Sequence, residues 1–297
     1  MASRIFVLSC AAAVLCGILL CPLHCRAEET VTVPLPAPTP PLVTTPLPVN
    51  PSAPAPVATV EVAVDPIVRP MSRGGNLGEY SLSFSDEFSG DKLNAKVWDC
   101  RTDSRYWSTQ KADNVVVADG YLHLKLKKEK AGRLDYSGAG IICKRSFRYG
   151  YYEASIKLPP GKGWHTSFCL NQYKSEPTGA RQEINVLEDD SISLKEYMVN
   201  IQIKKPRPRS FGPKHVGAPN MSADFHVYGC EFTPEKARFF LDGELVSTMD
   251  ASEFVHDDMS VWISCFGAPL SRTLHIDDTQ LPSEVTVDWV RVYEKHK

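Results

Sequence analysis

The chain has 297 residues, of which 43% are hydrophobic and 23% are charged, and its formal net charge is −2. These proportions are those of a soluble globular protein, so they exclude a multi-span membrane protein and a disordered polyelectrolyte. The absence of a basic excess argues against a nucleic-acid-binding surface. Proline is unevenly distributed, since 12 of the 23 prolines lie between Pro34 and Pro70. The chain therefore divides into segments of different character.

Residues 1–27 have the features of a secretory signal peptide. Arg4 precedes an apolar run from Ile5 to Leu20, and Cys25-Arg26-Ala27 offers a small-residue cleavage site. The run is shorter than the roughly 20 residues that a membrane-spanning helix needs, which favours export over a transmembrane anchor. A lipid anchor through Cys21 or Cys25 is the weaker alternative. We therefore expect a protein that is secreted or exposed at the cell envelope, in the periplasm or outside the cell.

Residues 28–76 form a proline-rich, low-complexity stretch with no period that could build a core. Proline removes backbone donors and favours extended polyproline geometry. The segment is predicted to be a disordered, semi-rigid linker. Such a spacer could tether the following domain to a membrane or a cell wall.

Residues 77–297 read as a succession of short strands. Asp119-Gly120 lies between Val115–Val117 and the alternating run Tyr121–Lys127, and Asp242-Gly243 lies between two further runs, which are both strong hairpin signals. No amphipathic segment of helical length is found. The pattern predicts an all-β domain, a sandwich or jelly roll of two antiparallel sheets. Five cysteines fall in this part, at positions 100, 143, 169, 230 and 265. The odd number leaves at least one thiol without a partner in the chain, and most are expected to be small buried residues.

The chemistry is concentrated in the stretch from Arg181 to Asp190, which contains Glu183, Asn185 and Glu188. In a regular strand Glu183 and Asn185 share a face, whereas Glu188 points the other way. One β-bulge between Asn185 and Glu188 would bring both glutamates to one cleft, with Asn185 between them. Two carboxyl groups about 5 Å apart suit a retaining glycosidase. The alternative is that these are solvated charges on an exposed strand.

The same stretch resembles the active-site strand of glycoside hydrolase family 16, whose members include laminarinases, lichenases, agarases and carrageenases. The family motif is Glu-(aliphatic)-Asp-(aliphatic)-x-Glu. Further segments resemble the family in order along the chain: Phe84–Gly90 with Val97-Trp98, Arg148–Pro159, Gly161–Phe168, Phe225–Thr233 with Leu241–Gly243, and Val287–Tyr293. The resemblance implies a concanavalin A-like β-jelly roll with a concave substrate cleft.

The resemblance also implies roles for the three residues of the motif. Glu183 falls on the nucleophile and Glu188 on the acid/base. Asn185 replaces the aspartate that, in the family, hydrogen-bonds to the nucleophile and tunes its charge. An amide can still donate a hydrogen bond to a carboxylate, but it adds no negative charge that raises a neighbour's pKa. A second departure is Cys169, where the family often has an aromatic residue.

Sugar binding requires flat apolar faces for C–H surfaces and polar groups for hydroxyls. The candidate platforms are Trp164, Trp107 and Phe266, each with a role in the core as the alternative. His165 is the candidate donor in the cleft wall. Along Tyr197–Ile203 the alternation predicts that Asn200 and Gln202 face the cleft.

Two weaker expectations concern ions. No cofactor is expected to be required, but many family members carry a structural calcium, and Asp288 matches its aspartate ligand; a water-capped surface aspartate is the alternative. The basic stretch 204–209 is either a solvated loop or a loop that contacts sulfate or uronate groups, since guanidinium groups bind such anions through paired hydrogen bonds.

Three functions are consistent with the sequence. The first is a secreted retaining endo-β-glycosidase that hydrolyses a polysaccharide, either a β-glucan or an algal galactan. The second is a carbohydrate-binding relative that has lost catalysis, and the third is an extracellular structural or adhesion domain. Retention of both glutamates favours the enzyme, whereas Asn185 and Cys169 argue for the binding relative. We expect a monomer whose partner is a polysaccharide and not a nucleic acid.

Overall fold

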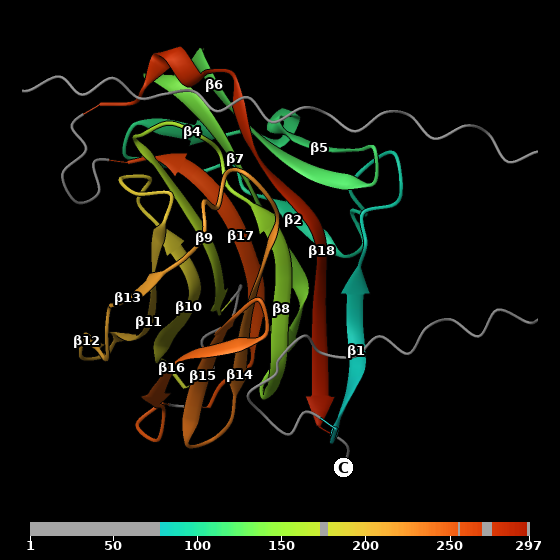
Figure 1. Cartoon of the computed structure of the whole chain (residues 1–297), viewed down its shortest axis with the longest axis vertical. Coiled ribbons are helices and arrows are strands. Elements are labelled where there is room, and N and C mark those ends of the chain that lie inside the picture. Colours follow the sequence, from blue (N-terminus) through green and yellow to red (C-terminus); the bar gives the residue numbers. More distant parts are fainter. Residues whose placement is uncertain (1–77, 173–177, 255, 269–274, 296–297) are drawn as a thin grey trace, which may run out of the picture. The chain divides into compact units, whose positions relative to one another are not determined.

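The computed structural model describes residues 78–172, 178–254, 256–268 and 275–295. The predicted signal peptide and the proline-rich linker lie outside the described residues. The described domain is built almost entirely of strands, as the sequence predicts (Figure 1). Its two short 3₁₀ helices are η1 (Ala112–Asn114) and η2 (Asp278–Gln280). No helix among these residues has the length and apolar character that crossing a membrane requires.

The sandwich has two layers. The layer that does not carry the candidate glutamates, here called the opposite sheet, is antiparallel and is organised around the long last strand. That strand, β18, pairs with β1, β6 and β8, and β8 continues the sheet through β14 to β15 and β16. The members are β1 (Tyr80–Asp86), β5 (Val115–Ala118), β6 (Tyr121–Ala131), β8 (Gly150–Lys157), β14 (His226–Phe232), β15 (Lys236–Leu241), β16 (Glu244–Asp250) and β18 (Ser283–Lys295).

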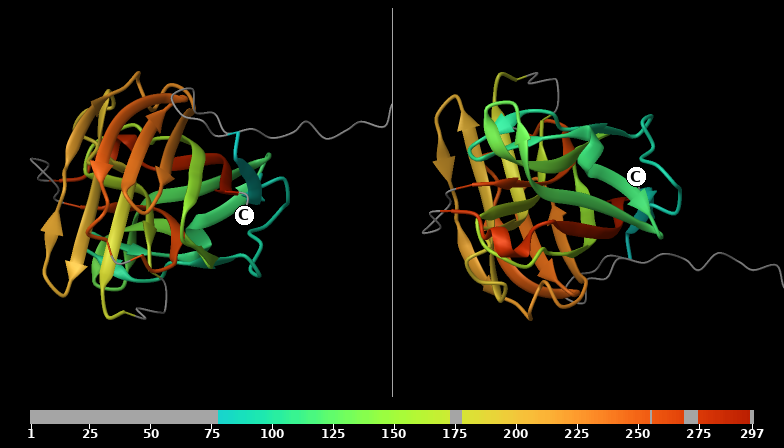
Figure 2. Two further views of the ribbon diagram at one scale, coloured as in Figure 1. Left: turned by 90° about the horizontal axis from the view of Figure 1, so that it is seen from below. Right: turned by 90° about the horizontal axis from the view of Figure 1, so that it is seen from above.

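The second layer, here called the cleft sheet, runs in the order β2, β7, β17, β9, β10, β11, with the short strands β12 and β13 against β11. Its strands are β2 (Trp98–Cys100), β7 (Leu134–Phe147), β9 (Trp164–Asn171), β10 (Arg181–Asp189), β11 (Glu196–Lys205), β12 (Arg209–Ser210), β13 (Lys214–Gly217) and β17 (Met259–Gly267). The two layers are joined where β6 pairs with β7, and Figure 2 gives two end-on views of this curved arrangement.

A small strand pair beside the cleft sheet holds part of the cleft wall. It consists of β3 (Ser104–Arg105) and β4 (Ser108–Gln110), and β4 runs parallel to β7. All other strand pairs of the described domain are antiparallel. The predicted architecture of two antiparallel sheets is therefore confirmed, with one parallel contact added at its margin.

Both predicted hairpin turns are confirmed. Asp119 and Gly120 have φ values of 55° and 82° between β5 and β6, and Asp242 and Gly243 have φ values of 50° and 81° between β15 and β16. Positive φ at both central residues is the geometry of a type I′ turn, which suits the twist of paired strands.

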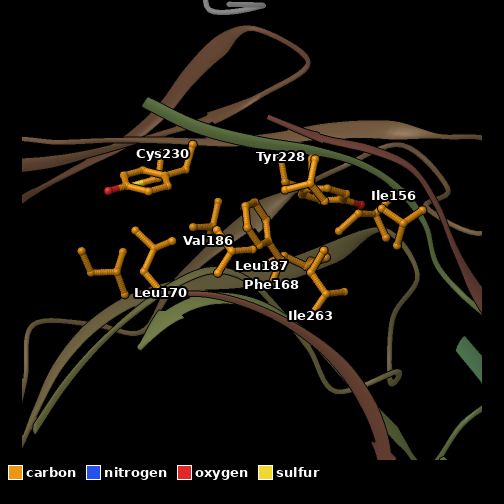
Figure 3. Packing of buried hydrophobic residues seen from close by; sticks show 14 of the residues in the cluster. Ile156, Phe168, Leu170, Val186, Leu187, Tyr228, Cys230 and Ile263 are labelled. Atoms are coloured by element: carbon orange, nitrogen blue, oxygen red, sulfur yellow. The ribbon is translucent and has the colours of Figure 1, made fainter. Parts of the chain in front are cut away.

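The core lies between the two sheets and is filled by alternate residues of each strand. From the cleft sheet it receives Phe168 and Leu170 of β9 and both Val186 and Leu187 of β10, all at most 1% exposed. Figure 3 shows these side chains below Tyr228 and Cys230 of β14 in the opposite sheet. Two consecutive core residues on β10 break the alternation expected of a regular strand, and this break sets up the site on the outer face. All five cysteines of the domain are unpaired, and all but Cys100 are buried.

Candidate active site

A β-bulge in β10 brings the two candidate glutamates to the same cleft. The register of β10 shifts between Asn185 and Glu188 against β11, and between Asn185 and Leu187 against β9. The bulge turns Val186 and Leu187 into the core and returns Glu188 to the face that carries Glu183. Both carboxyl groups line one cleft of about 750 Å³. The predicted bulge is confirmed, and so is the shared groove of the two glutamates, whereas Asn185 is buried and does not line the groove as predicted.

Glu183 is largely buried and is contacted through one of its two carboxyl oxygens. The side chain is 13% exposed. The amide of Asn171 on β9 donates to Oε2 at 3.0 Å, and the ammonium group of Lys204 on β11 forms an ion pair with the same oxygen. A cation and an amide donor therefore hold the carboxyl group in place from two strands.

Glu188 lies in a different environment. Burial, and then the charge of Glu183, raise its pKa to about 7. Its neighbour is His165 on β9, whose Nε2 is 3.6 Å from Oε1 of Glu188. Burial lowers the pKa of His165 to about 3, so the imidazole is neutral and adds no positive charge that would ionise Glu188. Glu183 thus contacts a cation, whereas the raised pKa of Glu188 lets it retain a proton near neutral pH. Such a difference in environment is typical of the acid/base pairs of glycosidases.

The pKa of Glu188 predicts the alkaline side of the activity profile. If the protonated form is the acid, kcat/KM falls as the pH rises through about 7, because the carboxylate cannot protonate a leaving group. We expect a tenfold loss for each further pH unit, and Glu188→Gln should remove this limb. The measurement is kcat/KM between pH 5 and pH 9. A wild-type profile that stays flat up to pH 9 contradicts the assignment.

Asn185 lies between the two glutamates on β10, and its side chain is buried. It is 1% exposed, and its Nδ2 has no hydrogen-bond partner in the part of the chain that the structure describes. The sequence interpretation allowed this amide to donate to Glu183. The structure instead places the donor on the neighbouring strand, at Asn171. Asn185 therefore supplies neither the charge nor the hydrogen bond that the family motif attributes to this position.

The aromatic surface of the cleft comes from β17 and from the segment beside β3. Phe266 lines the cleft as predicted and lies 4.9 Å from the His165 ring, centroid to centroid. Trp262 also lines it and was missed, although it has the same strand parity as Phe266. Trp262 is the register partner of Cys169, so it puts an indole beside the position where the family often has an aromatic residue. Tyr106 is 51% exposed and stacks on Phe266 at 6.0 Å.

One predicted platform is wrong. Trp164 is 1% exposed and belongs to the core, where it contacts Tyr136 edge-on. On β9 the residues that face the cleft are His165, Ser167, Cys169 and Asn171, so Trp164 has the opposite parity. Trp107 is partly buried against the same core, and its role as a platform stays a prediction, whereas its neighbour Tyr106 is exposed.

The two polar residues predicted on β11 have different surroundings. Gln202 lines the cleft. Asn200 shares its strand parity but is 3% exposed. Its Oδ1 accepts a hydrogen bond from Ser210 of β12 at 3.0 Å, and Gly212 lies so close that a Cβ there would be 2.8 Å from that oxygen. The segment after β11 therefore covers Asn200, and the prediction that it contacts substrate is wrong.

Basic side chains outnumber acidic ones along the cleft. Three acidic side chains line it, those of Asp103, Glu183 and Glu188, together with five basic ones, those of Arg101, Arg105, Arg181, Lys204 and Lys205. Arg101 is held by Asp103 through two hydrogen bonds of 3.0 and 2.7 Å. Arg105 lies over the Phe266 ring at 5.1 Å. Cations next to aromatic faces suit a ligand that carries both apolar sugar faces and negative charges.

The calcium expectation remains a prediction. Asp288 lies on β18, away from the cleft sheet, and Ser155 approaches its carboxyl group at 3.5 Å. Burial, and then the charge of Glu87, raise the pKa of Asp288, whereas Ser155 and Arg291 lower it. Among the described residues no group of three or more His, Cys, Asp or Glu side chains is placed to hold a metal. A calcium ion at Asp288 would therefore depend mainly on backbone oxygens.

Comparisons with known proteins agree with this geometry. The family model for the GH16 domain of beta-porphyranases A–D matches residues 79–295. A beta-glucanase of Rhodothermus marinus is 26% identical over 74% of this chain and 87% of its own length. Beta-porphyranase E of Zobellia galactanivorans is 26% identical over 71% of this chain and 86% of its own length.

A solved structure shares the fold. The kappa-carrageenase of Pseudoalteromonas carrageenovora, crystallised with an oligotetrasaccharide of kappa-carrageenan, superposes with a TM-score of 0.65 at 22% identity. The match covers 75% of this chain and 98% of that one. With the jelly roll, the bulged strand and a family match over the whole described domain, the chain belongs to glycoside hydrolase family 16, whose endo-glycosidases act on β-glucans or algal galactans.

Proposed function

We propose that this protein is a secreted retaining endo-β-glycosidase that cleaves an algal galactan carrying anionic groups. The observation that carries the proposal is the pairing of an ion-paired Glu183 with a Glu188 whose pKa is raised to about 7, in one cleft. Glu183 is the nucleophile and Glu188 is the acid/base. Residues 1–27 would direct export, and residues 28–76 would serve as a spacer or a tether to the cell surface.

The proposed reaction has two steps. In the first, a carboxyl oxygen of Glu183 bonds to the anomeric carbon while the bond to the leaving oxygen breaks, and that oxygen takes the proton of Glu188. In the second, water attacks the anomeric carbon and gives a proton to Glu188, and the bond to Glu183 breaks. The second step restores both carboxyl groups, and the two displacements together retain the β configuration.

The charge of the cleft supports a galactan over a neutral β-glucan. Basic side chains outnumber acidic ones along the cleft by five to three, and sulfate or carboxylate groups of a substrate accept paired hydrogen bonds from guanidinium groups. The names of the relatives do not decide between a glucan and a galactan, since they include both a beta-glucanase and a beta-porphyranase. The choice of substrate therefore rests on the residues of the cleft.

A panel of polysaccharides tests the proposal. The secreted protein is incubated with porphyran, kappa-carrageenan, agarose, laminarin and mixed-linkage β-glucan, and new reducing ends are measured. We expect internal cleavage of a sulfated galactan, with the β anomer as the first product in NMR spectra. Cleavage of laminarin alone contradicts the galactan assignment. Binding without cleavage of any polymer selects the non-catalytic relative.

The exchange Asn185→Asp tests the departure from the motif. A carboxylate at this buried position adds a negative charge next to Glu188, which should raise the pKa of Glu188 further. A rise of about one pKa unit keeps about ten times more of the acid protonated above neutral pH. We therefore expect roughly tenfold higher kcat/KM at pH 8 than in the wild type, with a smaller gain at pH 6. The measurement is the pH profile of both proteins, and a slower variant at every pH contradicts this account of the amide.

A further inference from the structure

The contacts of the Glu183 carboxylate are unequal. Nζ of Lys204 and Nδ2 of Asn171 both contact Oε2. Among the described residues Oε1 has no hydrogen-bond partner. The two donors come from β11 and β9, the strands on either side of β10. They therefore hold the carboxylate from both flanks and leave one oxygen free.

We propose that Lys204 is a positioning residue for the nucleophile, which fixes Oε2 together with Asn171 so that Oε1 is the attacking oxygen. This inference rests on the proposed function. In the first step the Oε1–carbon bond forms as the bond to the leaving oxygen breaks, and Lys204 stays paired with Oε2. Lys204 thereby supplies from β11 the control over the nucleophile that Asn185, with its unpartnered amide, does not supply from β10.

The charge of Lys204 also reaches the acid. Lys204 is among the groups that lower the pKa of Glu188, against the larger effects of burial and of Glu183. Removing it should therefore raise the pKa of Glu188, which loses a nearby positive charge. A role confined to packing would not move that pKa.

Other charges face the pair from each neighbouring element. The basic ones are Arg181 on β10, Lys205 on β11, and Arg101 and Arg105 beside β3, and the acidic ones are Asp103 and Asp190. His165 on β9 also faces the pair but is neutral. These charges remain when Lys204 is replaced, so the difference between variant and wild type isolates Lys204. Among the described residues Lys204 is the cation in contact with Glu183.

The test compares Lys204→Met, Lys204→Gln and Lys204→Arg with the wild type on porphyran and on agarose, a neutral galactan, from pH 4 to pH 9. Lys92→Met is the matched control, an exposed lysine outside the cleft. We expect kcat to fall about 10- to 100-fold in the Met and Gln variants, the range that loss of alignment in an active site causes. The alkaline limb of the pH profile, which reports Glu188, should move upward, and Lys204→Arg should return it toward the wild type. Thermal melts establish that the variants are folded.

The outcomes separate the inference from the proposed function. A wild type that cleaves no glycan, or a Glu183→Gln variant as active as the wild type, overturns the proposed function. An active wild type with an inactive Glu183→Gln, but with unchanged kcat and pH limbs in Lys204→Met, overturns only the inference. A higher KM on porphyran alone, with kcat unchanged, also overturns it, because Lys204 then contacts the anionic groups of the substrate and does not position Glu183.

Discussion

We expect Glu183→Gly to lose nearly all hydrolysis and to regain turnover when azide is supplied. The carboxylate forms the bond to the anomeric carbon in the proposed reaction, and loss of a nucleophile costs on the order of 10⁴–10⁶-fold in kcat. Truncation to glycine opens space in a cleft that already admits a sugar. Azide entering that space attacks from the side of Glu183, so the product is the α-glycosyl azide, whose configuration is inverted. The substrate is an aryl β-glycoside of the oligosaccharide that the wild type releases, and the azide product is identified by NMR.

The matched exchange at the other glutamate gives the opposite configuration. In Glu188→Gly, Glu183 still forms the covalent intermediate from an aryl glycoside, and azide then displaces it to give the β-glycosyl azide. The exposed carboxylate Glu79, paired with Lys295 at 2.6 Å outside the cleft, provides the control, since Glu79→Gln should leave turnover unchanged. Formation of the α-glycosyl azide by Glu188→Gly would show that Glu188 is the nucleophile and would contradict the proposed roles.

The fold could be predicted because its signals are local. Asp-Gly turns between alternating runs locate β5, β6, β15 and β16, and the alternation of apolar residues reveals which face of each strand is buried. The bulge in β10 is less local, but it is the arrangement that lets Val186 and Leu187 both enter the core while Glu183 and Glu188 share the cleft. The motif was therefore sufficient to predict that the two glutamates share a cleft.

The cleft walls were predicted less well because they depend on contacts between distant segments. Lys204 was recognised as part of a basic stretch, but its ion pair with Glu183 requires the register of β10 against β11. Asn200 has the predicted parity and is covered by a segment that follows ten residues later. Nothing in the sequence around Asn171 identifies it as the donor to Glu183, since that contact is set by the pairing of β9 with β10.

Strand parity was also decisive for the aromatic residues. Trp164 and His165 are adjacent, so one of them must face the core when the other faces the cleft. The sequence interpretation assigned both to the sugar site, which a regular strand does not allow. The structure places His165 beside Glu188 and Trp164 in the core. Tyr106, Trp262 and Phe266 take over the apolar surface that the prediction assigned to Trp164.

Trp164→Ala should therefore lower stability and leave sugar binding to the folded protein unchanged. Removing a fully buried indole costs about 3–5 kcal/mol, from lost burial and from the cavity that remains, and Trp164 is 1% exposed. Tyr106→Ala should do the reverse. Tyr106 is 51% exposed at the rim, so its loss should change the free energy of unfolding by no more than about 0.5 kcal/mol, while a sugar ring loses its stacking face. Urea unfolding and affinity electrophoresis in porphyran gels measure the two effects. Weaker sugar binding by folded Trp164→Ala, with an unchanged free energy of unfolding, would show that Trp164 faces the cleft and would contradict the parity of β9.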